Sequence, residues 1–155
     1  MASPPDTRIQ ELKLTLPPAP KAMAKYKPLV RVGALAYLSG HGPLQPDGTL
    51  IRGRVGADLN ADQGYQAARQ VGLATLATVK ANLGSLNKVK RLIKTFGLVL
   101  CTPEFTDQPK VMNGFSELMA EVFGDETGVG ARSAVGTSAL PGGIAVEVEC
   151  IFEVE

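Results

Sequence analysis

The sequence is poor in the residues that bind metal ions. It contains one histidine, His41, and two cysteines, Cys101 and Cys150. Because no Cys-x-x-Cys or His-Glu-x-x-His spacing occurs, we expect no metal site. Both cysteines fall in apolar, strand-like stretches, which predicts buried core residues in a reducing compartment rather than a disulfide.

Long apolar runs and an excess of one charge are absent as well. No stretch of the sequence is long and apolar enough to cross a bilayer as a helix. The first six residues lack the charged-then-apolar pattern of a signal peptide, so we expect a cytoplasmic protein without a membrane partner. The 16 basic and 15 acidic residues nearly balance. Since no basic run or basic-aromatic stripe occurs, nucleic acid is not an expected partner.

What the sequence does contain is a regular alternation of strand and helix patterns, which predicts one domain, 1–155. The clearest helix pattern is at 61–83, where apolar residues recur every three or four positions. Asn60 is its expected N-cap, Gln63 the capping-box partner and Gly84 the C-terminal stop. The other expected elements are a short helix at 8–15, two strands within 28–39, a strand at 88–101, a helix at 110–123, and strands at 132–139 and 144–154.

This order of elements predicts an α+β fold, in which one sheet carries both long helices on one face. The second face should be partly apolar. The residues that indicate this are Val30, Val32, Phe96, Leu98 and Leu100. Because a lone two-layer domain would leave that face in water, we expect an oligomer that covers it.

Charged residues near the end of the chain pose a question about function. Residues 140–143, Leu-Pro-Gly-Gly, predict a hairpin turn between the last two strands. In that hairpin Arg132 would face Ile151 and share one face with Glu147 and Glu149. One interpretation is a solvated ion pair that contributes less than about 1 kcal/mol. The other is that the planar guanidinium binds an anionic ligand while a glutamate positions a water. The pattern alone leaves both open.

Three segments resemble motifs of one family. YLSGHGPL, residues 37–44, matches a Ser-Gly-Gln-x-Pro turn, and DQPKVMNGFSELMAEVFG, residues 107–124, matches an Asn-containing second helix. ARSAVGTSALPGGIAVEVEC, residues 131–150, matches an Ala-Arg-Ser stretch, a Leu-Pro turn and a Val-Glu-Ile-Glu strand. The sequence therefore resembles the RidA/YjgF family of enamine/imine deaminases over residues 24–154.

The resemblance implies a fold, an assembly and a reaction. The fold is chorismate-mutase-like, with one mixed sheet and two helices on one face. The assembly is a homotrimer whose sheets face inward, with sites at the subunit interfaces. The reaction is the hydrolysis of reactive 2-enamine/2-imine acids, such as 2-aminoacrylate and 2-iminobutanoate, to 2-keto acids and ammonia, without a cofactor.

The resemblance also assigns roles to five residues. Arg132 matches the arginine that binds the substrate carboxylate, and Glu147 the glutamate that orients water or shuttles protons. Tyr26, Ser39 and Asn113 match residues that line the substrate cleft. An imine carbon is already electrophilic once its nitrogen is protonated, so a held carboxylate, a positioned water and a modest acid-base group suffice for hydrolysis.

The sequence also departs from the family pattern. Ala134 replaces a frequent cysteine, His41 replaces the glutamine of the turn, and Ser116 replaces a tyrosine. Residues 1–24 form a longer N-terminal extension. These differences indicate a divergent subgroup, and we expect His41 to be structural rather than catalytic.

Two alternative functions follow from the same family. One is a non-catalytic trimer that binds small molecules in the same cleft. The other is an endoribonuclease. The sequence argues against it, because it contains no basic channel, no aromatic stacking platform and no paired histidines.

Overall fold

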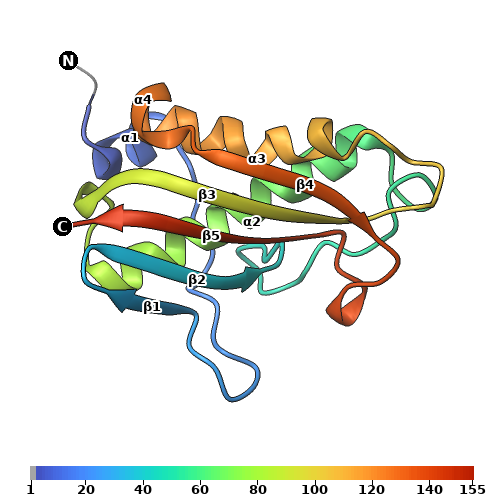
Figure 1. The fold of residues 1–155 in the computed structure, drawn as a ribbon, viewed down its shortest axis with the longest axis horizontal. Coiled ribbons are helices and arrows are strands. Elements are labelled where there is room, and N and C mark those ends of the chain that lie inside the picture. Colours follow the sequence, from blue (N-terminus) through green and yellow to red (C-terminus); the bar gives the residue numbers. More distant parts are fainter. Residues whose placement is uncertain (1–2) are drawn as a thin grey trace.

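A five-stranded sheet with helices on one face forms the body of the molecule (Figure 1). The computed structural model describes residues 3–155. The strands are β1 (Leu29–Val32), β2 (Leu35–His41), β3 (Val89–Leu100), β4 (Ala131–Thr137) and β5 (Val146–Val154). The helices are α1 (Pro5–Glu11), α2 (Ala61–Leu83), α3 (Gln108–Phe123) and α4 (Asp125–Gly128), with 3₁₀ turns η1 (Leu86–Lys88) and η2 (Pro141–Gly143). The predicted α+β fold is confirmed.

The strand order is β1-β2-β5-β3-β4. All neighbouring strands are antiparallel except β3 and β4, which run parallel. The predicted hairpin between the last two strands is therefore wrong, because β3 lies between β4 and β5. Helix α3 connects β3 to β4, and a strand-helix-strand succession allows the two strands to lie parallel and side by side. For this reason β4 pairs with β3 and not with β5.

The predicted placement of the charges is wrong for the same reason. Arg132 pairs with Thr95 of β3, and Thr95 pairs in turn with Cys150, both of which are buried under the helices. Glu147 pairs with Leu98 on the opposite face. Arg132 thus lies on the helical side of the sheet and the glutamates on the open side.

Helix α2 spans the predicted residues because its ends are defined locally. The Asn60 side chain accepts a hydrogen bond from the backbone N–H of Gln63, and the Gln63 side chain accepts one from the backbone N–H of Asn60. Gly84 ends the helix in the left-handed conformation, with φ of 84°. Helix α3 crosses α2 closely at Gly114, where a β-carbon would lie 2.0 Å from the carbonyl oxygen of Tyr65.

The N-terminal segment is docked on the helical layer. Helix α1 begins and ends earlier than the predicted 8–15, because Pro5 suits a first helical turn and Lys13 takes a positive φ of 53°. The side chains of Leu12, Leu14 and Leu16 then pack against the core.

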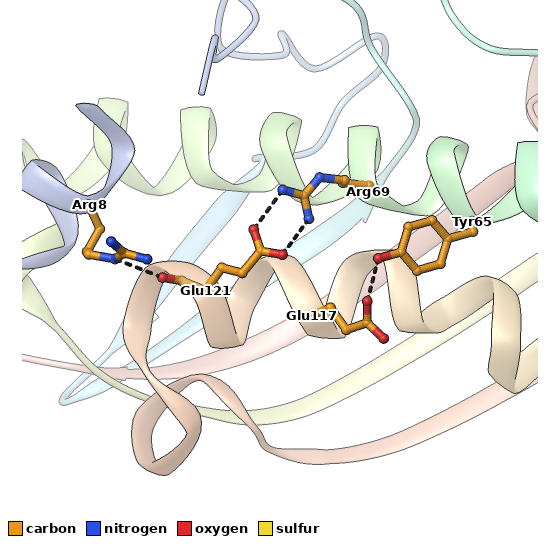
Figure 2. A network of polar contacts seen from close by, with 5 residues as sticks. All are labelled: Arg8, Tyr65, Arg69, Glu117 and Glu121. Carbon is orange, nitrogen blue, oxygen red and sulfur yellow. Dashed lines mark hydrogen bonds and ion pairs between the residues drawn. The ribbon is translucent and has the colours of Figure 1, made fainter. Parts of the chain in front are cut away.

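A polar network lies on the outer surface of the two long helices (Figure 2). The carboxylate of Glu121 in α3 accepts two hydrogen bonds from Arg69 in α2, at 2.7 and 3.1 Å. Tyr65 of α2 hydrogen-bonds Glu117 of α3 in the same row. Arg8 donates to the backbone carbonyl of Glu121, which ties α1 to the end of α3.

The second sheet face carries the exposed apolar side chains that the pattern predicted, with one exception. Val32 is 62% exposed, and Val30 and Tyr37 are more than two-fifths exposed. Phe96 and Leu98 are partly buried on this face, whereas Leu100 is buried. Both cysteines are buried and free, as expected, and burial raises the pKa of the Cys150 thiol.

Two further features concern residues 3–155 only. None of their helices is both long and apolar enough to cross a membrane. No three histidine, cysteine, aspartate or glutamate side chains among them gather closely enough to hold a metal ion.

Candidate functional site

A hollow of about 800 Å³ opens beside the end of β2. Residues of the segment before β1, of β2 and the turn after it, and of the beginning of β5 line it. Three of the predicted site residues, Tyr26, Ser39 and Glu147, line it. They come from three different segments, which the antiparallel pairing of β2 with both β1 and β5 brings together.

Glu147 is the half-buried acid of this hollow. Its carboxylate lies directly over Gly40, where a β-carbon would come within 2.5 Å of Oε1. Burial, and then the charge of Glu149, raises the pKa of Glu147 above its ordinary range. A carboxylate with a raised pKa accepts and returns protons more readily near neutral pH.

Ser39 connects β2 to the segment that carries Tyr26. Its hydroxyl donates to the carbonyl oxygen of Lys27 at 2.7 Å, and its backbone N–H donates to Pro28 at 2.9 Å. The Tyr26 side chain is 47% exposed, and its hydroxyl accepts from the backbone N–H of Met23 at 3.5 Å. Ser39 therefore holds the wall of the hollow in place.

His41 borders the hollow, but its side chain points into the core. It is 4% exposed, with Nδ1 at 2.6 Å from the carbonyl oxygen of Ser39 and Nε2 at 2.8 Å from the hydroxyl of Thr78 in α2. A carbonyl only accepts, so Nδ1 carries the proton and Nε2 accepts from Thr78. Burial lowers the pKa of His41. These contacts fit the structural role expected of it.

Arg132 and Asn113 lie elsewhere, at the edge strand β4 and the beginning of α3. The guanidinium donates to Asn113 Oδ1 at 2.9 Å and to Ser116 Oγ at 3.2 Å. A third donation goes to the carbonyl oxygen of Pro109 at 3.4 Å. Among residues 3–155, no carboxylate forms an ion pair with Arg132. The structure therefore does not support the interpretation that Arg132 is neutralised by a glutamate.

The five predicted residues thus form two groups within one chain. Tyr26, Ser39 and Glu147 line the hollow, whereas Asn113 and Arg132 lie together near the β4 edge. Strand β3 separates β5 from β4, and Arg132 points to the opposite face of the sheet from Glu147. Neighbouring strands lie about 4.8 Å apart, so two strand spacings and the thickness of the sheet separate Arg132 from Glu147.

The family comparison agrees with this architecture. The family described as YjgF/chorismate mutase-like, putative endoribonuclease, matches residues 6–148. The chain belongs to this family. The resemblance to RidA/YjgF proteins found in the sequence is thereby confirmed.

Individual proteins are similar to this chain over most of its length. Protein TCP17 of Trypanosoma cruzi is 39% identical over 145 residues, which are 94% of this chain and 91% of that protein. A putative endoribonuclease from Shewanella oneidensis superposes with a TM-score of 0.93 at 29% identity, covering 98% and 100% of the two chains. RidA from an Antarctic Psychrobacter superposes with a TM-score of 0.62 at 28% identity, covering 88% and 94%.

Sequence reasoning missed the apolar part of the hollow. Met23, Leu44, Leu50 and Ile144 line it, and none of them was singled out. The only local signal was the glycine- and proline-rich sequence after β2, which is typical of a turn. The isolated bridge between Leu44 and Leu50 folds this turn back on itself, and both leucines line the hollow.

Proposed function

We propose that this YjgF family member hydrolyses 2-enamine/2-imine acids to 2-keto acids and ammonia. The observation that carries the proposal is the state of Arg132. Its guanidinium is oriented by neutral acceptors, and no carboxylate of the described residues pairs with it. A cation held in this way is suited to bind the carboxylate of a small acid through its planar fork.

Glu147 supplies the acid-base group. Its carboxylate accepts a proton from water as the water oxygen bonds to the imine carbon, and the C=N electron pair moves to nitrogen. Glu147 then returns the proton to nitrogen, the C–N bond breaks as ammonia leaves, and the C=O bond forms as the Glu147 carboxylate accepts the hydroxyl proton. The raised pKa of Glu147 favours both the uptake and the return of that proton.

The site requires two copies of the chain. Arg132 and Asn113 of one protomer would face the hollow that contains Tyr26, Ser39 and Glu147 of a neighbour. The exposed apolar face with Val30, Val32 and Tyr37 is the surface that such a neighbour would cover. We propose a homotrimer with inward-facing sheets as the assembly, as in the family resemblance.

A coupled assay tests the activity. A pyridoxal-phosphate-dependent dehydratase generates 2-aminoacrylate or 2-iminobutanoate in situ, and the formation of keto acid is followed with and without the protein. We expect faster hydrolysis with the wild type and near-complete loss with Arg132→Ala. Arg132→Lys should lose most of the activity too, because an ammonium group does not present the bidentate fork.

Other outcomes of the assay favour the alternatives. Binding of a small carboxylate without any acceleration would favour a non-catalytic binding protein. RNA cleavage that Arg132→Ala abolishes would favour the endoribonuclease named in the family description. The structure offers little for that chemistry, since the one histidine of the chain is buried and hydrogen-bonded on both nitrogens.

A further inference from the structure

Strand β2 contains a β-bulge beside the hollow. The register of β2 on β5 shifts between Leu38 and His41. Ser39 and Gly40 therefore lie together opposite one residue of β5, Glu149. A bulge interrupts the regular ladder of hydrogen bonds and bends the strand, so its conformation depends on other contacts. Both bulged residues line the hollow, so those contacts also shape the candidate site.

The side chain of His41 supplies such contacts from the end of the strand. It is 4% exposed, and Nδ1 donates to the carbonyl oxygen of Ser39 at 2.6 Å. Nε2 accepts from the hydroxyl of Thr78 at 2.8 Å, and Thr78 is itself buried in α2. A buried polar group without a partner is costly, so the fold favours both contacts. The imidazole therefore ties the bulge to α2.

Two parts of the candidate site depend on the position of this bulge. The Glu147 carboxylate lies against Gly40, where a β-carbon would come within 2.5 Å of Oε1. Gly40 has no positive φ, so glycine serves this close approach rather than the backbone. On the other side, the Ser39 hydroxyl donates to the carbonyl oxygen of Lys27 at 2.7 Å, directly after Tyr26. The bulge thus contacts both the proposed proton acceptor and the segment that carries Tyr26.

We infer that His41 is a positioning residue: by tying the bulge to α2, it fixes where Glu147 and Tyr26 lie in the hollow. This inference rests on the proposed function, in which Glu147 is the proton acceptor. His41 acts through its neighbours, because its side chain is buried and both ring nitrogens are hydrogen-bonded. When the bulge loosens, the Glu147 carboxylate becomes more exposed to water, so its pKa falls toward the ordinary range.

Two buried threonines of α2 provide a matched test. Thr75 and Thr78 are both 1% exposed, but the Thr75 hydroxyl donates to a carbonyl oxygen within its own helix. Thr78→Val and Thr75→Val each remove one buried hydroxyl and keep a side chain of similar size. Only Thr78→Val removes the contact with His41. Lys21 and Glu149, the other charged residues that line the hollow, are unchanged in both variants.

The first measurement is the pH dependence of imine hydrolysis. In Thr78→Val we expect kcat at pH 7 to fall about tenfold and the acid limb of kcat/KM to move down by about half a pH unit. In Thr75→Val we expect the limb of the wild type, because a general loss of stability does not change the surroundings of Glu147. A limb that stays in place in Thr78→Val, or that moves equally in both variants, would overturn the inference.

Two further variants test the same contact. Thr78→Ser loses a methyl group but keeps the hydroxyl, so it should retain the limb of the wild type. His41→Leu removes both hydrogen bonds of the imidazole and should move the limb in the same direction as Thr78→Val. It answers the question if Thr78→Val folds poorly, and a wild-type limb in His41→Leu would overturn the inference as well.

Carbon-13 NMR separates the inference from the proposed reaction. The side-chain carboxyl signal of Glu147, assigned by its loss in Glu147→Gln, reports its pKa without any substrate. We expect this pKa to fall in Thr78→Val and to keep the wild-type value in Thr75→Val. If it does so while no imine is hydrolysed faster, His41 positions Glu147 and the proposed reaction is wrong. If imines are hydrolysed but the pKa of Glu147 is the same in both variants, the inference is wrong and the proposed function stands.

Discussion

At the scale of single residues, Glu147 and Glu149 show how two like charges divide their roles. Glu147 is half-buried over Gly40, while Glu149 is exposed on the same face of β5. Burial raises the pKa of Glu147, and the charge of Glu149 raises it further. Glu147 is thus suited to exchange protons, and the charge of Glu149 adjusts the pKa of Glu147.

This arrangement predicts the effect of Glu149→Gln on the pH profile. Removing the neighbouring negative charge should lower the pKa of Glu147, so the acid limb of kcat/KM for imine hydrolysis should move to lower pH. The measurement is the pH–rate profile of the variant beside the wild type. Glu153→Gln is the matched control, because Glu153 lies on the same strand and face but is not among the charges that shift Glu147. An unmoved limb in Glu149→Gln would contradict the assignment of Glu147 as the proton acceptor.

His41 makes a second prediction, for stability. Burial places its folded-state pKa below the ordinary 6.5. The unfolded chain therefore takes up a proton first as the pH falls, so the contribution to stability is complete above about pH 6.5 and is lost below it. The free energy of unfolding should fall by up to about 1.4 kcal/mol per pH unit from this group.

Urea unfolding between pH 5.5 and 7 measures this slope. His41 is the chain's only histidine, so no other imidazole contributes. Glu147 acts with the opposite sign, because a raised folded-state pKa adds stability as the pH falls. We therefore compare wild type with His41→Gln, whose amide oxygen can accept from Thr78 near the position of Nε2 and which carries no group that titrates in this range. A variant with the same slope as the wild type would refute the prediction.

At the scale of elements, the sequence predicted the helix whose ends depend on local contacts, but it did not predict the pairing of distant strands. Helix α2 could be predicted to the residue, because Asn60, Gln63 and Gly84 define its ends through contacts within one turn. The predicted hairpin of β4 and β5 was wrong. The turn signal at residues 140–143 is local, and it does not reveal that β3 lies between the two strands. The strand-helix-strand order over β3, α3 and β4 was the signal for parallel pairing.

The capping box at α2 predicts a defined loss of stability. Asn60→Ala removes the acceptor for the Gln63 backbone N–H and should cost about 1 kcal/mol. Asn60→Asp keeps an acceptor and adds a negative charge at the N-terminus of the helix, so it should retain wild-type stability. Urea unfolding of the three proteins, with unchanged slopes, is the measurement. An unchanged free energy of unfolding in Asn60→Ala would show that the side-chain cap contributes nothing, and equal losses in both variants would show that the acceptor oxygen is not its cause.

At the scale of the whole molecule, the sequence names candidate site residues one by one but does not reveal how they are arranged. The family motifs identified Arg132 and Glu147, yet nothing in the spacing of these residues reveals that they point to opposite faces of one sheet. That relation depends on the position of β3 between β4 and β5. A single chain therefore contains both halves of the proposed site without uniting them.

If Arg132 of one protomer and Glu147 of its neighbour form one site, two inactive variants should restore activity when they are mixed. Arg132→Ala and Glu147→Gln should each be inactive alone. When the two variants are co-expressed, mixed trimers contain some interfaces with an intact Arg132 from one protomer and an intact Glu147 from its neighbour. Random mixing gives about a quarter of such interfaces, so activity should return to about a quarter of the wild-type value.

The control separates shared sites from simple rescue of folding. Co-expressing Arg132→Ala with a chain that carries both substitutions provides no intact Arg132, so activity should remain absent although trimers form. Sedimentation of each mixture confirms that the assembly is unchanged. If the two single variants stay inactive together while forming mixed trimers, the two groups do not act across an interface. The hollow and Arg132 would then serve separate ligands, which the calorimetric binding of keto acids to each variant would detect.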